Sequence, residues 1–152
     1  MDDPFKPPKA NLEVPRVLGP PPRSVKGAYG LLCVSASLTL LLTVAMWLGV
    51  LPAAAGSTLG MTTASNLVGA GVIFFFAWKI RTARNWARWI LAIWTALGVA
   101  GWSVSILILP AAWSAVPVVY SVIGIVQALL QLAAVVGTFT APARAWFREA
   151  SS

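Results

Sequence analysis

Three amide side chains are the polar groups best placed for chemistry within the long apolar runs of this sequence. Gln127 and Gln131 are four residues apart, so on a helix they share one face, and Asn66 lies in a different run. An amide surrounded by hydrocarbon has to find a hydrogen-bond partner. We therefore predict interhelical polar contacts at Asn66, Gln127 and Gln131, with Asn66 as the partner of the glutamines. The alternatives are a polar pore lining and a face for self-association.

Ionisable side chains are missing from the same apolar runs. The chain has no His, one Cys (Cys33) and only four Asp and Glu, none of which lies in a run. Pumps and coupled transporters generally place an ionisable group inside the membrane, and catalysis or metal binding needs acids, bases or ligands. The composition argues against a proton-coupled exporter. We predict a non-enzymatic protein with no catalytic residue, cofactor or metal site.

The overall composition is that of an integral membrane protein. Of 152 residues, 59% are hydrophobic and 10% charged, and the mean hydropathy is +0.81, whereas soluble domains carry about 25% charged residues. The first run, 28–51, would form roughly 36 Å of helix, enough to cross a hydrocarbon core of about 30 Å. We predict an all-α bundle of four transmembrane helices, because the runs lack the alternation of a β-barrel. The predicted spans are about 28–51, 59–79, 89–109 and 116–140.

The segments outside the spans are polar and short. Residues 1–27 hold seven of the eleven prolines, so we predict a disordered, basic, cytoplasmic tail there, and residues 141–152 form a second short cytoplasmic tail. A cleaved signal peptide ending near Ala55 is the alternative for the first span. Its apolar core is longer than the usual 7–15 residues or so, which favours a retained helix.

The positive charges predict the topology. All eleven Lys and Arg lie in the two tails and the connection between the second and third runs, while the other two connections carry none. The positive-inside rule then places both termini in the cytoplasm. Because the basic residues flank apolar runs rather than cluster on a soluble face, we expect no nucleic-acid partner.

Three arginines in the middle connection could reach lipid headgroups. Arg81, Arg84 and Arg88 are spaced i, i+3, i+7, with tryptophans interleaved. On one helix they would line the inner leaflet, where each contributes about 1 kcal/mol against anionic headgroups. We expect topological anchoring, with a specific contact to anionic lipid or to a partner protein as the functional alternative.

Small residues at helical spacing predict close helix packing. The pairs are Ser65 with Gly69, Gly98 with Gly101, Gly124 with Ala128, and Ala133 with Gly137. Small residues let helix backbones approach closely in membranes. We expect this packing within one chain, and packing between two copies is the alternative.

The polar ends of the chain resemble a group of proteins. The opening Asp3-Pro4-Phe5-Lys6-Pro7-Pro8-Lys9-Ala10 resembles the Asn-Pro-Tyr-x-x-Pro-x-Ala start of small four-span inner-membrane proteins of Gram-negative bacteria, with Asp3 and Phe5 in place of Asn and Tyr. The segments 84–88 and 143–147 look like the same group. The resemblance implies a bacterial inner-membrane location and supplies no activity.

The functional prediction is a non-enzymatic accessory or interaction subunit in the bilayer, associated with a larger membrane complex. The alternative is a small passive transporter or a pore formed by self-association, lined by Asn66, Gln127 and Gln131. A pore requires oligomers, whereas an accessory subunit requires a different membrane protein as its partner.

Overall fold

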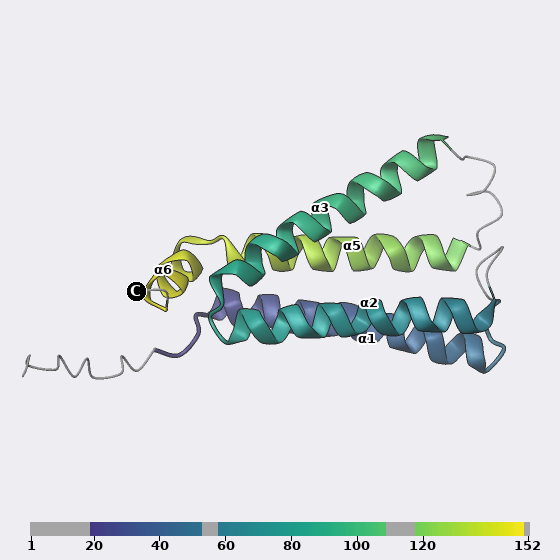
Figure 1. The fold of residues 1–152 in the computed structure, drawn as a ribbon, viewed down its shortest axis with the longest axis horizontal. Helices are drawn as coiled ribbons and strands as arrows, with labels where there is room; N and C mark the ends of the chain where they lie inside the picture. The colour runs from purple at the N-terminus through teal and green to yellow at the C-terminus, as the bar shows by residue number, and fades with distance from the viewer. Residues whose placement is uncertain (1–18, 53–57, 109–117, 151–152) are drawn as a thin grey trace, which may run out of the picture.

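A computed structural model describes residues 19–52, 58–108 and 118–150, and helices are the only regular secondary structure in this part of the chain. The helices are α1 (Arg23–Trp47), α2 (Leu59–Arg81), α3 (Asn85–Ile108), α5 (Val118–Thr138) and the short α6 (Ala141–Glu149) (Figure 1). By length and composition, the first four are long and apolar enough to cross a membrane. The prediction of an all-α protein with four such helices is confirmed.

The ends of the first helix differ from the predicted span of 28–51. Helix α1 begins at Arg23, and the carbonyl of Pro22 accepts the backbone N–H groups of Val25 and Lys26. The polar residues before position 28 are thus partly helical, because a proline is well tolerated before a first turn. At the other end, Gly49 adopts a φ of 70°, a conformation that glycine adopts without strain, and α1 has already ended at Trp47.

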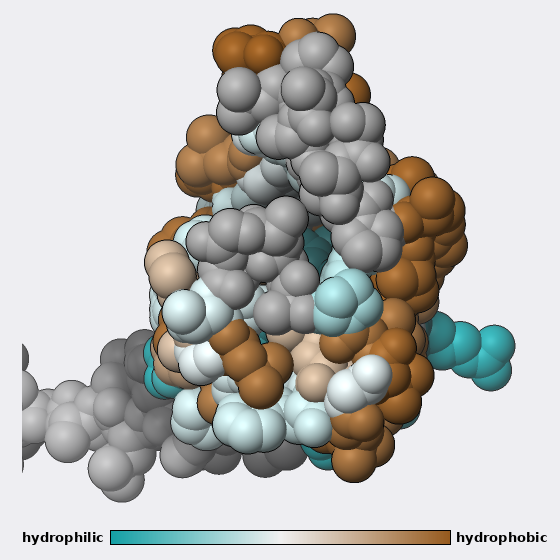
Figure 2. All heavy atoms as spheres, turned by 90° about the vertical axis from the view of Figure 1, so that its right-hand side faces the viewer, coloured by the Kyte–Doolittle hydropathy of each residue, from teal (hydrophilic) through white to brown (hydrophobic). Residues whose placement is uncertain are grey.

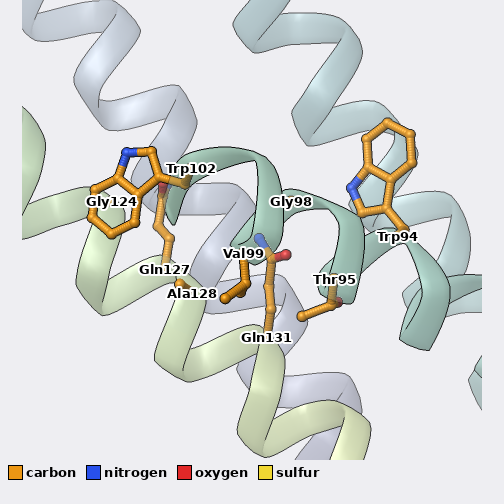
Figure 3. Close-up of a pocket in the computed structure, with 9 residues that line it drawn as sticks. All are labelled: Trp94, Thr95, Gly98, Val99, Trp102, Gly124, Gln127, Ala128 and Gln131. Atoms are coloured by element: carbon orange, nitrogen blue, oxygen red, sulfur yellow. The ribbon is translucent and has the colours of Figure 1, made fainter. Parts of the chain in front are cut away.

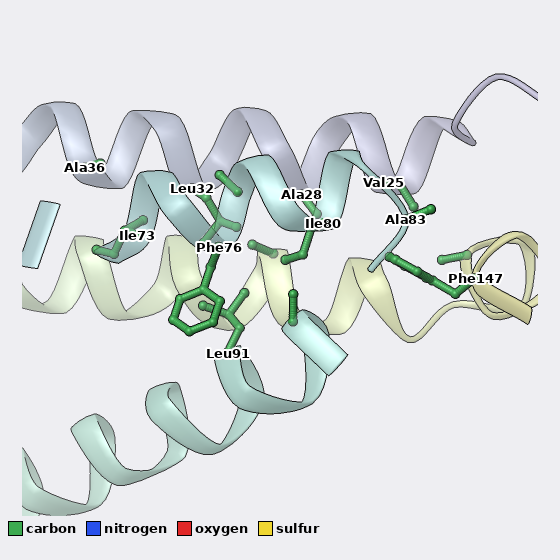
Figure 4. Packing of buried hydrophobic residues seen from close by; sticks show 14 of the residues in the cluster. Val25, Ala28, Leu32, Ala36, Ile73, Phe76, Ile80, Ala83, Leu91 and Phe147 are labelled. Atoms are coloured by element: carbon green, nitrogen blue, oxygen red, sulfur yellow. The ribbon is translucent and has the colours of Figure 1, made fainter. Parts of the chain in front are cut away.

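Helix α6 lies in the segment that we expected to be a simple tail. Pro142 stands at its first turn, where a missing N–H costs nothing. Its buried residues are Ala143, Trp146 and Phe147, which share one face at spacings of three and four. Phe147 reaches toward the start of α1 and the connection between α2 and α3 (Figure 4). The indole N–H of Trp146 donates to the carbonyl of Gly19 at 2.9 Å. The tail is therefore docked on the bundle.

Helix α1 is the centre of the bundle and packs antiparallel to both α2 and α5 (Figure 1). Fully buried alanines form much of these contacts: Ala36 in α1, Ala77 in α2 and Ala134 in α5. At Gly137 of α5, an added Cβ would lie 3.4 Å from the backbone oxygen of Ser24. Small residues thus hold α1 and α5 close within one chain.

Helix α3 separates from α5 along its length (Figure 1). Its buried residues lie in its first half, from Ala87 to Thr95, and near its end Leu107 is 79% exposed. An added Cβ at Gly98 or Gly101 would meet no atom within 4 Å. Among the residues that the structure describes, the close packing that we predicted for this glycine pair is therefore not made.

Most of the outer surface of the four long helices is hydrophobic. Viewed from the end opposite to α6, hydrophobic side chains surround the sides of the bundle (Figure 2). Residues as large as Trp47, Val68 and Leu129 are more than half exposed. Soluble proteins rarely expose apolar patches of this extent, so these faces suit contact with lipid.

Candidate functional site

A row of hydroxyl groups on α1 organises the polar interior. Ser35, Thr39 and Thr43 are spaced by four residues, so they follow one another along one face of the helix. The Thr39 hydroxyl donates to the carbonyl of Ser35 at 3.3 Å, and the Thr43 hydroxyl donates to the carbonyl of Thr39 at 2.9 Å. Each threonine hydroxyl donates its proton to a carbonyl of α1, and the lone pairs of its oxygen can accept hydrogen bonds from other helices. We call these three residues the hydroxyl row.

The three amides that we singled out all donate to the hydroxyl row. The Gln127 amide reaches the Thr39 hydroxyl at 2.8 Å and the Ser35 carbonyl at 3.3 Å. The Gln131 amide donates to the Ser35 hydroxyl at 3.2 Å. From α2, the Asn66 amide donates to the Thr43 hydroxyl at 2.9 Å. These bonds connect α1 to both neighbours in the bundle.

The expected pairing of Asn66 with the glutamines is not the arrangement in the structure. Asn66 and Gln127 approach successive turns of α1, at Thr43 and Thr39, so α1 hydroxyls are their partners. The recurrence of hydroxyl residues at every fourth position of the first apolar run is the signal that could have identified these partners.

A groove separates the middle of α3 from α5. It encloses a pocket of about 220 Å³, with the indoles of Trp94 and Trp102 at its two ends (Figure 3). We call this the α3–α5 groove; its lining residues are Trp94, Thr95, Gly98, Val99, Trp102, Gly124, Gln127, Ala128 and Gln131. The Thr95 side chain is only 4% exposed, and its hydroxyl has no hydrogen-bond partner among the described residues. A buried hydroxyl without a hydrogen-bond partner destabilises the folded protein, and Thr95 places such a hydroxyl in the wall of the groove.

Arg81, Arg84 and Arg88 do not lie on one helix, which corrects the geometry that we expected for them. Helix α2 ends at Arg81, Ala83 adopts a left-handed φ of 61°, and α3 begins at Asn85. This short reversal is needed because α2 and α3 run in opposite directions through the bundle.

The three arginines consequently have different surroundings. The Arg81 guanidinium lies 5.3 Å from the ring of Tyr29, and Arg84 is exposed between the two helices. Arg88 is buried, within 6 Å of the rings of Trp89, Phe139 and Phe147. Of the three arginines, only Arg88 is therefore enclosed by other side chains of the protein.

Within the described residues, no group of three or more His, Cys, Asp or Glu side chains could hold a metal ion. No protein-family model, curated protein or solved structure matches this chain.

Proposed function

We propose that this chain is a multi-pass protein of the bacterial inner membrane with both termini in the cytoplasm. The support is the distribution of charge: the cations of the described residues gather at one end of the bundle, where α1 and α3 begin, α2 and α5 end, and α6 packs (Figure 1). They are Arg23, Lys26, Lys79, Arg81, Arg84, Arg88, Arg144 and Arg148. The positive-inside rule assigns such an end to the cytoplasm.

Cysteine labelling in intact cells tests this orientation. Because Cys33 is the only cysteine, Cys33→Ser provides a background for single cysteines at the two ends of α2. Thr58→Cys should react with a membrane-impermeant maleimide added outside the inner membrane. Thr82→Cys should react only after the membrane is opened. The reverse labelling pattern, or equal labelling at both positions, would contradict the proposed topology.

We further propose that the protein is a non-enzymatic accessory subunit whose α3–α5 groove receives a transmembrane helix of another membrane protein. The observation that carries this proposal is the groove itself. Small residues at Gly98 and Ala128 permit close backbone approach, and a Cβ added at Gly98 would meet no atom within 4 Å. An apolar helix with small side chains on one face would fit between α3 and α5 at these positions.

Two features favour a different protein over a pore made of identical copies. The amide groups of Gln127 and Gln131 donate to α1, so these donors are already engaged rather than turned to a water-filled lumen. A two-fold pair brings the same surface of both copies together, and two concave grooves cannot fill one another. An oligomeric pore would need the copies to assemble head to tail.

A matched pair of glycine substitutions tests the groove. Gly98→Leu fills the groove, whereas Gly69→Leu places the same side chain on α2, outside the groove; an added Cβ meets no atom within 4 Å at either site. After gentle extraction at native expression, we expect Gly98→Leu to reduce recovery of the partner about tenfold or more, which corresponds to a loss of about 1.4 kcal/mol in binding. Gly69→Leu should retain it.

Two results would contradict this proposal. One is equal recovery of the same partner with both leucine variants, which would exclude the α3–α5 groove as the contact surface. The other is recovery of homo-oligomers alone from the unaltered protein, which would support the oligomeric pore. Quantitative mass spectrometry of the co-purified proteins measures both.

A further inference from the structure

Arg88 is a buried cation at the cytoplasmic end of the proposed topology. It lies in the first turn of α3, only 7% of its surface is exposed, and its guanidinium carbon is 5.0 Å from the ring of Phe147 and 5.1 Å from that of Phe139. These rings come from α6 and from the segment between α5 and α6. Arg88 is therefore enclosed between the start of α3 and the docked C-terminal helix.

The hydrogen-bonding capacity of Arg88 is largely unused. Its Nε and Nη1 atoms are buried and have no acceptor among the described residues. Aromatic faces attract the charge of a guanidinium, but they do not replace in-plane acceptors for its N–H groups. A buried charge without such partners is costly, so the site lacks an anionic or strongly accepting group.

Neighbouring positive charges raise the cost of burying Arg88 further. Arg144 of α6 donates its Nε–H to the carbonyl of Phe139 at 2.7 Å, and the ring of the same Phe139 lies 5.1 Å from the Arg88 guanidinium. Arg148 lies one turn further along α6, and both arginines act on Arg88 with charge of the same sign. The described residues contain a single acidic side chain, Glu149. The amino terminus of α3 adds partial positive charge beside Arg88. An anion placed here would be stabilised by three guanidinium groups and one helix terminus.

We propose that Arg88, Arg144 and Arg148 form a binding site for a phosphate-type oxyanion, as carried by an acidic phospholipid headgroup or by free phosphate. The planar guanidinium fork matches two phosphate oxygens with two parallel hydrogen bonds. Nε and Nη1 are covered by protein atoms, so the anion reaches them when α6 shifts outward.

Nanodiscs of defined composition test the site and distinguish the two sources of phosphate. The full-length protein is placed in pure phosphatidylcholine, in phosphatidylcholine with phosphatidylglycerol, and in pure phosphatidylcholine with inorganic phosphate. Thermal unfolding is followed by tryptophan fluorescence. Stabilisation by phosphatidylglycerol identifies a lipid headgroup as the source, and stabilisation by inorganic phosphate identifies the free anion.

The variants separate this site from general positive charge. Arg88→Gln should reduce the affinity for the stabilising anion about tenfold or more, since a charge-assisted, two-pronged contact is lost. Arg84→Gln removes an equal charge from a nearby exposed position and should lower the affinity much less than Arg88→Gln does. Arg88→Lys keeps the charge without the planar fork, so it should fold and still bind weakly, which covers the case in which the glutamine variant does not fold.

Three outcomes would overturn the proposal. The first is an absence of stabilisation by both phosphatidylglycerol and inorganic phosphate. The second is an equal loss of affinity in Arg84→Gln, which would show diffuse charge attraction. The third is unchanged affinity in Arg88→Lys or Arg88→Gln. Native mass spectrometry of the retained lipid provides an independent readout of the same comparison.

Discussion

Replacing Gly137 by leucine will push α5 away from α1 and lower the stability of the whole bundle. An added Cβ at this position already lies 3.4 Å from the backbone oxygen of Ser24 and 3.6 Å from the Cβ of Ala28. The remaining leucine atoms would have to displace backbone rather than a flexible side chain. Overpacking of this kind costs about 1–3 kcal/mol and occasionally more. The expected result is a clear decrease in the detergent or denaturant concentration needed for unfolding.

The matched control for this substitution lies on α3. Gly101→Leu adds the same side chain where an added Cβ meets no atom within 4 Å, so we expect its unfolding midpoint to stay close to that of the unaltered protein. An equal decrease of the unfolding midpoint in both variants would show that leucine lowers stability for a reason other than the contact between α1 and α5. Unchanged stability of Gly137→Leu would show that the close contact between α1 and α5 is not formed in the membrane.

Replacing Phe147 by alanine will release α6 from the bundle while the four long helices remain folded. Phe147 is fully buried, and its ring lies against Arg88 and close to that of Trp146. Removing a buried phenylalanine side chain costs about 3–5 kcal/mol in protein cores. An isolated helix of nine residues is only marginally stable in water, so α6 should lose its helical structure once it is undocked. Hydrogen–deuterium exchange at residues 141–149 should rise strongly.

The control is the same substitution at a phenylalanine that is partly exposed and lies on a different helix. Phe74 on α2 is 38% exposed, and Phe74→Ala should leave exchange at residues 141–149 unchanged. If Phe147→Ala also left this exchange unchanged, α6 would be held by other contacts, such as the bond from Trp146 to Gly19. A general increase of exchange over α1 and α5 would show instead that Phe147 supports the entire bundle.

The long helices could be predicted from sequence because each requires only a local property. A run of about 20 apolar residues without charge is sufficient to propose a spanning helix, and four such helices are present. Helix ends were less predictable, since α1 extends back to Arg23 through polar residues after Pro22. Helix α6 was missed because its apolar residues are few, although Ala143, Trp146 and Phe147 already show helical spacing.

The contacts between helices could not be predicted from any one apolar run, because they depend on how the helices are arranged around each other. Asn66, Gln127 and Gln131 could be recognised as groups that need partners, but their partners depend on which helices are neighbours and at which depth they meet. The same is true of Arg88. Its burial follows from the reversal at Ala83 and from the docking of α6, and neither can be read from the spacing of Arg81, Arg84 and Arg88.

The hydroxyl row has a consequence for the order in which the protein is assembled during synthesis. Helix α1 leaves the ribosome before its glutamine partners on α5 have been made, so it must enter the lipid without them. It can do so at little cost because the hydroxyl protons of Thr39 and Thr43 are already bonded to carbonyls of the preceding turn. The unused oxygen lone pairs then accept Asn66 as the first hairpin inserts and Gln127 when α5 arrives. The first helix therefore carries preformed acceptors for the two helices that pack against it, so its own order does not depend on theirs.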